Sequence, residues 1–195
     1  MFRKKIVIIG AGGHAKSVID IIEELRNWKI IGLIGRENEE SKQVSGYSVI
    51  GTDKDLQFIR KECKYAFIGI GQIKTCEPRI RIAKELERLE FEIPAIKSKN
   101  AYISKRAIIG RGTLVSHGTI INSGAKIGKN AIINSGAIIE HDSKICDYTH
   151  ISTGTIINGG AVVEKMSFIG SNSMVREGVT VPECSIIRAG SIVMK

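Results

Sequence analysis

A strict six-residue period runs through the second half of this chain. Every sixth residue from 103 to 193 is Ile or Val: Ile103, Ile109, Val115, Ile121, Ile127, Ile133, Ile139, Ile145, Ile151, Ile157, Val163, Ile169, Val175, Val181, Ile187 and Val193. Two residues before each of these the side chain is Ala, Ser or Thr, with Val179 the one exception, and three residues after it Gly or Asn is common. A hexapeptide period of this kind is the signature of a parallel β-helix.

A triangular coil of three short strands explains the pattern. Side chains alternate along a strand, so the branched residue and the small residue two before it both point inward. Gly and Asn then turn the chain, because they tolerate positive φ. A β-sandwich rich in Ile and Val is the alternative, but its turn signals recur about every 8–12 residues. The repeat supplies about five coils, stacked about 4.8 Å apart.

The first part of the chain alternates strand and helix patterns. A continuous apolar run, typical of a buried parallel strand, is followed by a glycine turn and an amphipathic helix. Further strands are predicted at residues 28–34, 65–70 and 91–96, and further helices from Asp53, taken as a helix cap, and from Pro78. The fold class is therefore α/β plus all-β, with a small Rossmann-like domain over residues 1–96 and a β-helix over residues 97–195.

Composition excludes several classes of protein. No apolar run approaches the about 20 residues of a membrane span, and the apolar run after the basic start ends at Gly10, too early for a secretory signal. Cys63, Cys76, Cys146 and Cys184 show no CxxC spacing, which indicates reduced thiols in the cytoplasm and no metal cluster. The net charge of +9 is scattered among few aromatic residues, which argues against nucleic acid and favours anionic small ligands such as phosphates.

The glycine turn Gly10-Ala11-Gly12-Gly13-His14-Ala15 has the geometry of a phosphate cradle, since free N–H groups at a helix start favour an anion. An NAD site would also need an acidic residue at the end of the second strand. That strand ends in Gly35-Arg36, so a mononucleotide such as a UDP-sugar fits better. A tight turn without a ligand is the remaining alternative.

The histidines give the candidate chemistry. His141 lies between Glu140 and Asp142, and either carboxylate could fix its tautomer and raise its basicity, as a general base requires. His150 precedes the inward Ile151, so it is expected to point outward, half a coil away from His141. The two can share a site only across an oligomer interface. A zinc site like that of a trimeric β-helical carbonic anhydrase is the alternative, but there is no H-x4-H pair and His117 is expected at another corner.

The outward rows predict an oligomer. The residues that precede the inward positions form two apolar rows and one mixed row: Tyr102, Ile120, Ile138, Ile156, Met174 and Ile192; Leu114, Ile132, His150, Phe168 and Ile186; Ile108, Lys126, Lys144, Val162 and Thr180. Exposed apolar stripes mark interfaces, and non-identical faces that meet head to tail close a ring. For triangular prisms the natural closure is threefold, hence a homotrimer.

The chain resembles the sialic-acid O-acetyltransferase (NeuD) family of sugar acyltransferases and is similar to bacterial UDP-4-amino-sugar N-acetyltransferases. The resemblance rests on the glycine turn, Gly69-Ile70-Gly71, the hexapeptide array, Glu140-His141-Asp142 and Tyr148-Thr149-His150-Ile151-Ser152. It implies a trimer of left-handed β-helices that binds acetyl-CoA between subunits and takes a UDP-sugar in the Rossmann-like domain.

The resemblance also implies residue roles. His141 matches the general base and Asp142 the residue that increases its basicity. His150, Ser171 and Ala189 match acetyl-CoA contacts, and Gly12, Gly13, His14 and Gly71 match sugar-nucleotide contacts. The activity implied is direct, metal-free acetyl transfer to the amine of a UDP-linked amino sugar. O-acetylation of sialic acid or another sugar hydroxyl is one alternative, and a non-catalytic trimeric scaffold is another.

Three departures from the family pattern are visible. Gly35-Arg36 replaces an expected Asp, Ser98-Lys99 replaces a His-Pro pair, and the sequence reaches Lys195 without a Gly-x-Pro-Ala segment that touches CoA.

Overall fold

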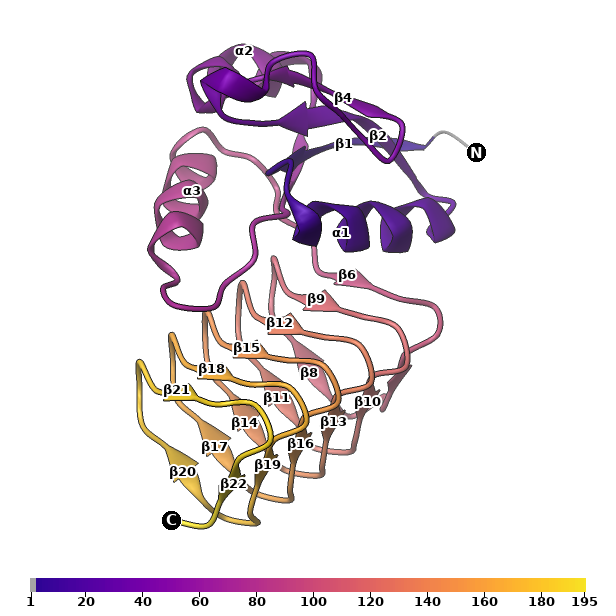
Figure 1. Ribbon diagram of the computed structural model, residues 1–195. Coiled ribbons are helices and arrows are strands. Elements are labelled where there is room, and N and C mark those ends of the chain that lie inside the picture. The colour runs from indigo at the N-terminus through magenta and orange to yellow at the C-terminus, as the bar shows by residue number, and fades with distance from the viewer. Residues whose placement is uncertain (1–2) are drawn as a thin grey trace. The chain divides into compact units, whose positions relative to one another are not determined.

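The computed structural model describes residues 3–195; Met1 and Phe2, the first residues of the predicted N-terminal domain and of its basic start, lie outside it. The chain forms two compact units (Figure 1). The first contains the described residues up to Gly71 together with Glu77–Pro94. The second contains Gln72–Cys76 and Ala95–Lys195.

The first unit is a five-stranded sheet with the order β3-β4-β2-β1-β5. Its strands are β1 (Lys4–Ile9), β2 (Trp28–Ile34), β3 (Gln43–Val44), β4 (Tyr47–Gly51) and β5 (Tyr65–Ile68). Its helices are α1 (Gly13–Glu24), α2 (Leu56–Glu62) and α3 (Glu77–Arg88), with short 3-10 turns η1 (Glu37–Glu39) and η2 (Asp53–Asp55). β1 pairs in parallel with both β2 and β5, and its residues 6–9 are buried, which explains the continuous apolar run.

The β3–β4 hairpin is an addition to the strands predicted from the sequence. Its two-residue turn, Ser45-Gly46, has positive φ at both positions (48° and 82°), as tight hairpin turns of the primed types do. β4 then pairs in parallel with β2, so the hairpin extends the sheet at that edge.

Two local predictions in this unit are wrong. Asp53 is not the helix cap: the Thr52 side chain accepts from the Lys54 N–H, and the Thr52 N–H donates to Asp55 Oδ2 at 2.8 Å. Residues 91–96 do not form a strand of the sheet, because Pro94 has no N–H and only Glu92 makes a bridge, to Tyr65. Ile96 belongs instead to β6 (Ile96–Lys97), which is part of the second unit.

The second unit is a β-helix built from two-residue strands, and from β7 onward each ends on one of the predicted inward Ile or Val residues. After β6 they are β7 (Tyr102–Ile103), β8 (Ile108–Ile109), β9 (Leu114–Val115), β10 (Ile120–Ile121), β11 (Lys126–Ile127), β12 (Ile132–Ile133), β13 (Ile138–Ile139), β14 (Lys144–Ile145), β15 (His150–Ile151), β16 (Ile156–Ile157), β17 (Val162–Val163), β18 (Phe168–Ile169), β19 (Met174–Val175), β20 (Thr180–Val181), β21 (Ile186–Ile187) and β22 (Ile192–Val193). They stack into three parallel sheets, seen as three rows of arrows in Figure 1, with the orders β22-β19-β16-β13-β10-β7, β20-β17-β14-β11-β8 and β21-β18-β15-β12-β9-β6.

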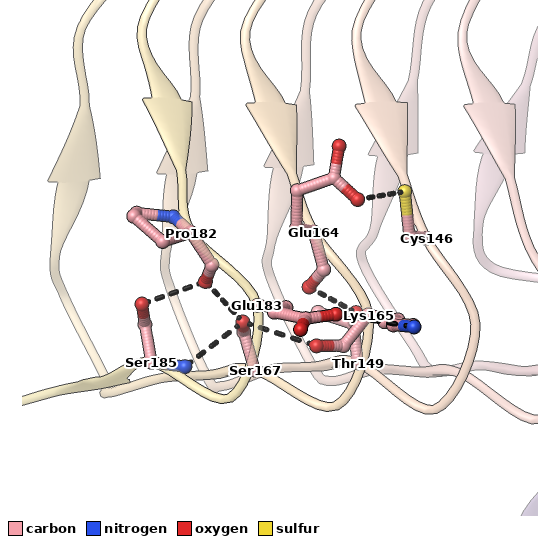
Figure 2. Close-up of polar contacts among 8 residues, drawn as sticks. All are labelled: Cys146, Thr149, Glu164, Lys165, Ser167, Pro182, Glu183 and Ser185. Atoms are coloured by element: carbon pink, nitrogen blue, oxygen red, sulfur yellow. Dashed lines mark hydrogen bonds and ion pairs between the residues drawn. The ribbon is translucent and has the colours of Figure 1, made fainter.

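The small inward residues explain how polar groups are accommodated inside the coil. Ser167 is fully buried; its hydroxyl donates to the Pro182 carbonyl at 2.9 Å and accepts from the Ser185 N–H at 3.2 Å (Figure 2). The Thr155 hydroxyl likewise donates to the Gly170 carbonyl, at 3.0 Å. These buried hydroxyl groups therefore have partners on the next coil, as buried polar groups require.

The corner turns use more residue types than Gly and Asn. Asp142, Tyr148, Met166 and Cys184 also take positive φ, between 55° and 61°. In each case the N–H donates to a carbonyl of the preceding coil, as Asp142 does to Ser123 at 3.0 Å. The stacking bonds of the coil thus impose the turn even where the residue does not favour it.

The outer rows differ from the prediction. The row on β7, β10, β16 and β22 is exposed, with Tyr102 at 61% and Ile156 at 37%. The row on β9, β12 and β15 is not an exposed stripe, because Ile132 is fully buried and His150 is only 7% exposed. At His150 the cover comes from the Gln72–Cys76 segment of the same unit. The first row is therefore exposed or half-buried along its length, whereas the second is buried from β9 to β15 and opens only at β18 and β21, where Ile186 is 58% exposed.

Among the described residues, no helix has both the length and the apolar character needed to cross a membrane.

Candidate active site

His141 lies at the corner that follows β13, and its side chain is exposed. Its Nδ1 is 3.0 Å from Asp142 Oδ2. An ionised carboxylate only accepts hydrogen bonds, so Nδ1 carries the hydrogen and the neutral ring has its lone pair on Nε2. The pair is thus arranged for Nε2 to take a proton from an incoming group.

Glu140 has a different role from Asp142. Its Oε2 accepts from Asn122 Nδ2 at 2.8 Å, and its carbonyl accepts from the Ser143 hydroxyl at 2.7 Å. These bonds tie Glu140 to the coil, so Asp142 is the carboxylate that orients the His141 ring.

Two glycines on the neighbouring coils make room for this pair. A Cβ at Gly159 would lie 2.7 Å from both Cε1 and Nε2 of His141, and a Cβ at Gly124 would clash with Asp142 Oδ1. Neither glycine was predicted from the sequence as part of the site. Their spacing could have identified them, since each glycine lies one full coil from the residue that it accommodates.

Ser171 and Ala189 lie at another corner of the coil, in successive turns. Ser171 Oγ is 2.9 Å from Ser152 Oγ, and the Gly190 N–H donates to the Ser171 carbonyl at 2.8 Å. This corner precedes β16, β19 and β22, whereas the His141 corner follows β13 of the same sheet. The two groups therefore lie at opposite edges of the exposed apolar face.

His150 is on the outer side of β15, as predicted, but it is enclosed. Its Nδ1 donates to the Gln72 carbonyl at 2.5 Å, while Gln72 Nε2 donates to the Tyr148 carbonyl at 2.8 Å. Its ring packs edge-on against Phe168, with the centroids 5.1 Å apart. The structure does not bring His150 together with His141.

His117 lies near the start of the β-helix, where its Nδ1 is 2.7 Å from Ser98 Oγ. Within residues 3–195 no group of three or more His, Cys, Asp or Glu side chains is placed to hold a metal ion.

The glycine turn is a separate candidate site, within the first unit. The spaces beside Gly12 and Gly13, at the start of α1, are open, with no atom within 4 Å of a Cβ built there. Gly71 lies against His14, since its Cβ position is 3.4 Å from His14 Cβ. The predicted contacts Gly12, Gly13, His14 and Gly71 are thus gathered at one end of the sheet, where helix N–H groups favour an anion.

Arg79 supports the loop that carries Gly71, and sequence reasoning missed it. It is 1% exposed, and its Nη1 donates to the carbonyls of Ile68 and Ile70 at 3.3 and 2.5 Å. A buried arginine on a helix leaves no distinct sequence signal, because its spacing alone looks like that of any surface arginine.

A small α/β domain joined to a hexapeptide β-helix, with an exposed His–Asp pair, defines the class of hexapeptide-repeat acyltransferases. Residues 5–86 match the family model of the PglD N-terminal domain. No curated protein sequence matches the chain significantly.

Solved structures match over nearly the whole chain. A perosamine N-acetyltransferase variant from Caulobacter crescentus, in complex with CoA and GDP-perosamine, is 28% identical, with a TM-score of 0.92 over 98% of this chain and 89% of that one. The acetyltransferase domain of PglB from Neisseria gonorrhoeae is 26% identical, with a TM-score of 0.90 over 98% of this chain and 92% of its own. The same domain in complex with acetyl coenzyme A has 24% identity and a TM-score of 0.67, covering 98% and 96% of the two chains, and bears on the fold alone.

The resemblance predicted from the sequence is confirmed: the N-terminal part of the chain matches the PglD N-terminal domain, and the similar solved structures are sugar acetyltransferases, which supports an acyltransferase. The predicted fold class, a small α/β domain followed by a left-handed parallel β-helix, is confirmed as well.

Proposed function

We propose that this protein transfers an acetyl group from acetyl-CoA to the amine of a nucleotide-linked amino sugar, with His141 as the general base. The observation that carries the proposal is the exposed His141 ring, held by Asp142 and seated over Gly159. The complex of the similar Caulobacter enzyme with CoA and GDP-perosamine supports both substrate classes. UDP is the nucleotide that we propose for this chain, in cytoplasmic glycan biosynthesis.

Transfer is direct. The sugar amine attacks the thioester carbonyl, and the new C–N bond forms as His141 Nε2 takes the amine proton. The C–S bond then breaks, and the CoA thiolate leaves and takes up that proton. Asp142 stabilises the imidazolium formed in between. Backbone N–H groups stabilise the oxyanion, because His150 is enclosed and already donates to the Gln72 carbonyl, and no covalent enzyme intermediate or metal is used.

We assign the nucleotide sugar to residues 1–96, through Gly12, Gly13, His14 and Gly71. Acetyl-CoA belongs to residues 97–195, through His150, Ser171 and Ala189. A homotrimer completes the site in this proposal. His141 and the Ser171–Ala189 corner lie at opposite edges of the exposed apolar face, so a head-to-tail ring brings one edge of a subunit to the other edge of the next.

The test is an acetyl-CoA assay in which UDP- and GDP-linked 4-amino-4,6-dideoxy sugars are compared with sialic acid. We expect turnover of a nucleotide-linked amino sugar. His141→Ala is expected to lower kcat by about 10²- to 10⁴-fold with the fold intact. Lys105→Ala, which changes an exposed residue of the same corner, is the control and is expected to act like wild type.

Three outcomes would count against the proposal. Turnover of sialic acid alone would assign the chain to O-acetylation instead. Absence of CoA binding in a calorimetric titration would favour a non-catalytic sugar-nucleotide scaffold. Unchanged transfer by His141→Ala would remove this residue from the role of base.

A further inference from the structure

At the end of β2 the carboxylate of Glu39, a residue from η1, lies beside Gly35. In α/β nucleotide sites an acidic side chain after the second strand receives the ribose hydroxyls, but here that position is Gly35. A Cβ built on Gly35 would lie 2.9 Å from Val49 Cγ1 and, because η1 folds back over it, 3.2 Å from Glu39 Cβ and 3.4 Å from Glu39 Oε2. The side chains of Val49 and Glu39 therefore fill the space in which a side chain of residue 35 would begin, and Glu39 brings a carboxylate to it.

The Glu39 carboxylate is held in that place from two sides. Its Oε2 accepts from the Arg36 N–H at 3.1 Å, and its Oε1 accepts from Lys42 Nζ at 2.8 Å. The hydrogen bond from Lys42, followed by the one from the Arg36 N–H, lowers the pKa of Glu39 below its usual value. The carboxylate is thus ionised at neutral pH and remains a hydrogen-bond acceptor.

Lys42 links this carboxylate to the glycine turn. Its Nζ also donates to the Ala11 carbonyl at 3.3 Å, and Ala11 lies between β1 and α1, next to the open positions of Gly12 and Gly13. The side chain is 46% exposed, so its ammonium group can exchange these partners for a ligand. A cation therefore lies beside the N–H groups that favour an anion.

We propose that Glu39 and Lys42 determine nucleotide recognition in this chain: Glu39 accepts hydrogen bonds from the ribose hydroxyls, and Lys42 pairs with the diphosphate. The inference rests on the proposed function, because it assigns residues to the same nucleotide-sugar site. It also explains how a chain with Gly35-Arg36 in place of an acidic residue can still hold a ribonucleotide.

The experiment is a calorimetric titration of the full chain with UDP and GDP and with their 2′,3′-dideoxy counterparts. Glu39→Gln keeps an acceptor for the Arg36 N–H but loses the charge. It is expected to weaken binding of the ribonucleotides by about tenfold and leave the dideoxy forms unchanged. Lys42→Met is expected to weaken both forms by about tenfold, since both carry the diphosphate.

A neighbouring ion pair provides matched controls. Glu37 is on the same 3-10 turn and pairs with Lys54 at 2.5 Å, with both side chains largely exposed. Glu37→Gln and Lys54→Met make the same charge changes without touching the glycine turn, and we expect affinities within about twofold of wild type. Thermal unfolding of all four variants checks that the unit remains folded.

The outcomes separate this inference from the proposed function. If the wild-type protein binds neither nucleotide, the proposed function and this inference are both wrong. If wild type binds and acetylates its sugar nucleotide, but Glu39→Gln keeps the preference for ribose or Lys42→Met binds normally, this inference alone is overturned.

Discussion

The His141 ring occupies space that is left because Gly159 has no side chain. In Gly159→Ala the new Cβ would lie 2.7 Å from Cε1 and Nε2 of the imidazole, and the exposed ring would move away. Since φ at Gly159 is not positive, the backbone accepts alanine. We therefore expect kcat to fall by about tenfold or more while the melting temperature changes little, measured by the acetyl-CoA assay and by thermal unfolding.

Gly178→Ala is the matched control at the same corner. Gly178 has φ of 68° and no atom within 4 Å of its Cβ position, so alanine strains the backbone without touching the imidazole. It is expected to cost about 1 kcal/mol of stability and to leave kcat unchanged. A loss of stability without a loss of activity in Gly159→Ala would contradict the assigned role of this space.

The reactivity of the Cys146 thiol depends on Glu164, which lies one coil further along the β-helix (Figure 2). Its pKa is raised by burial first and then by the hydrogen bond to Glu164 Oε2, at 3.4 Å. Glu164→Gln removes the negative charge, so more thiolate is present at a given pH below the thiol pKa. We expect iodoacetamide to alkylate Cys146 a few-fold faster in this variant at pH 8, with both rates rising as the pH rises.

The measurement uses mass spectrometry of the labelled peptide in a Cys184→Ser background, because Cys184 is exposed and reacts as well. Equal rates with and without Glu164 would show that burial alone controls this thiol.

At the scale of the element, the hydroxyls inside the coil and the charges outside it are expected to differ in their contribution to stability. Ser167→Ala leaves the Pro182 carbonyl and the Ser185 N–H without the buried hydroxyl that joins them. We expect a loss of about 1–3 kcal/mol in the free energy of unfolding, measured by urea denaturation.

Lys165→Met at the same corner is the comparison (Figure 2). Lys165 pairs with Glu183 at 3.1 Å, but both side chains are more than half exposed, so water screens the pair. A change of less than about 1 kcal/mol is expected. A larger loss from Lys165→Met than from Ser167→Ala would reverse this ranking of the two interactions.

The elements that can be predicted are those whose sequence pattern is local and recurs along the chain. Each β-helix strand carries its own inward Ile or Val, so the period alone locates every strand from β7 to β22. The sequence likewise predicts β2 at its observed bounds. The β3–β4 hairpin escapes prediction because β3 has only two residues, although Ser45-Gly46 is a turn signal. Positive φ at Tyr148 and Met166 has no sequence signal, since stacking imposes it.

At the scale of the whole molecule, the features that could not be predicted depend on segments far apart in the sequence. The segment Gln72–Cys76 belongs to the second unit although the residues on both sides of it belong to the first, and no sequence pattern predicts this. At β15 this segment covers His150, which the sequence alone presents as part of an exposed apolar stripe. Likewise, Glu39 belongs to no recognisable acidic motif, and only folding places it beside Gly35.

The burial of the row on β9, β12 and β15 also limits which faces of the β-helix can form an interface between subunits. With Ile132 and His150 enclosed, the exposed row that includes Tyr102, Ile120 and Ile156 is the apolar face left open along its length. An apolar face with several exposed side chains marks an interface, although Ile138 and Met174 on it are half-buried. In a ring it must meet a different surface of the next subunit, because head-to-tail contacts join non-identical faces.

Ile156→Lys tests this arrangement. Ile156 is 37% exposed at the middle of the face, so lysine can keep its charge in water in the isolated chain but not in a packed interface. We expect a smaller species in sedimentation analysis and a parallel loss of acetyl transfer, since the edges with His141 and Ser171 would no longer meet across subunits. Lys61→Ala, a charge change at an exposed position of α2, is expected to change neither. Full turnover by a monomeric Ile156→Lys variant would show that one chain carries a complete site, and the assignment of residues across the interface would then be wrong.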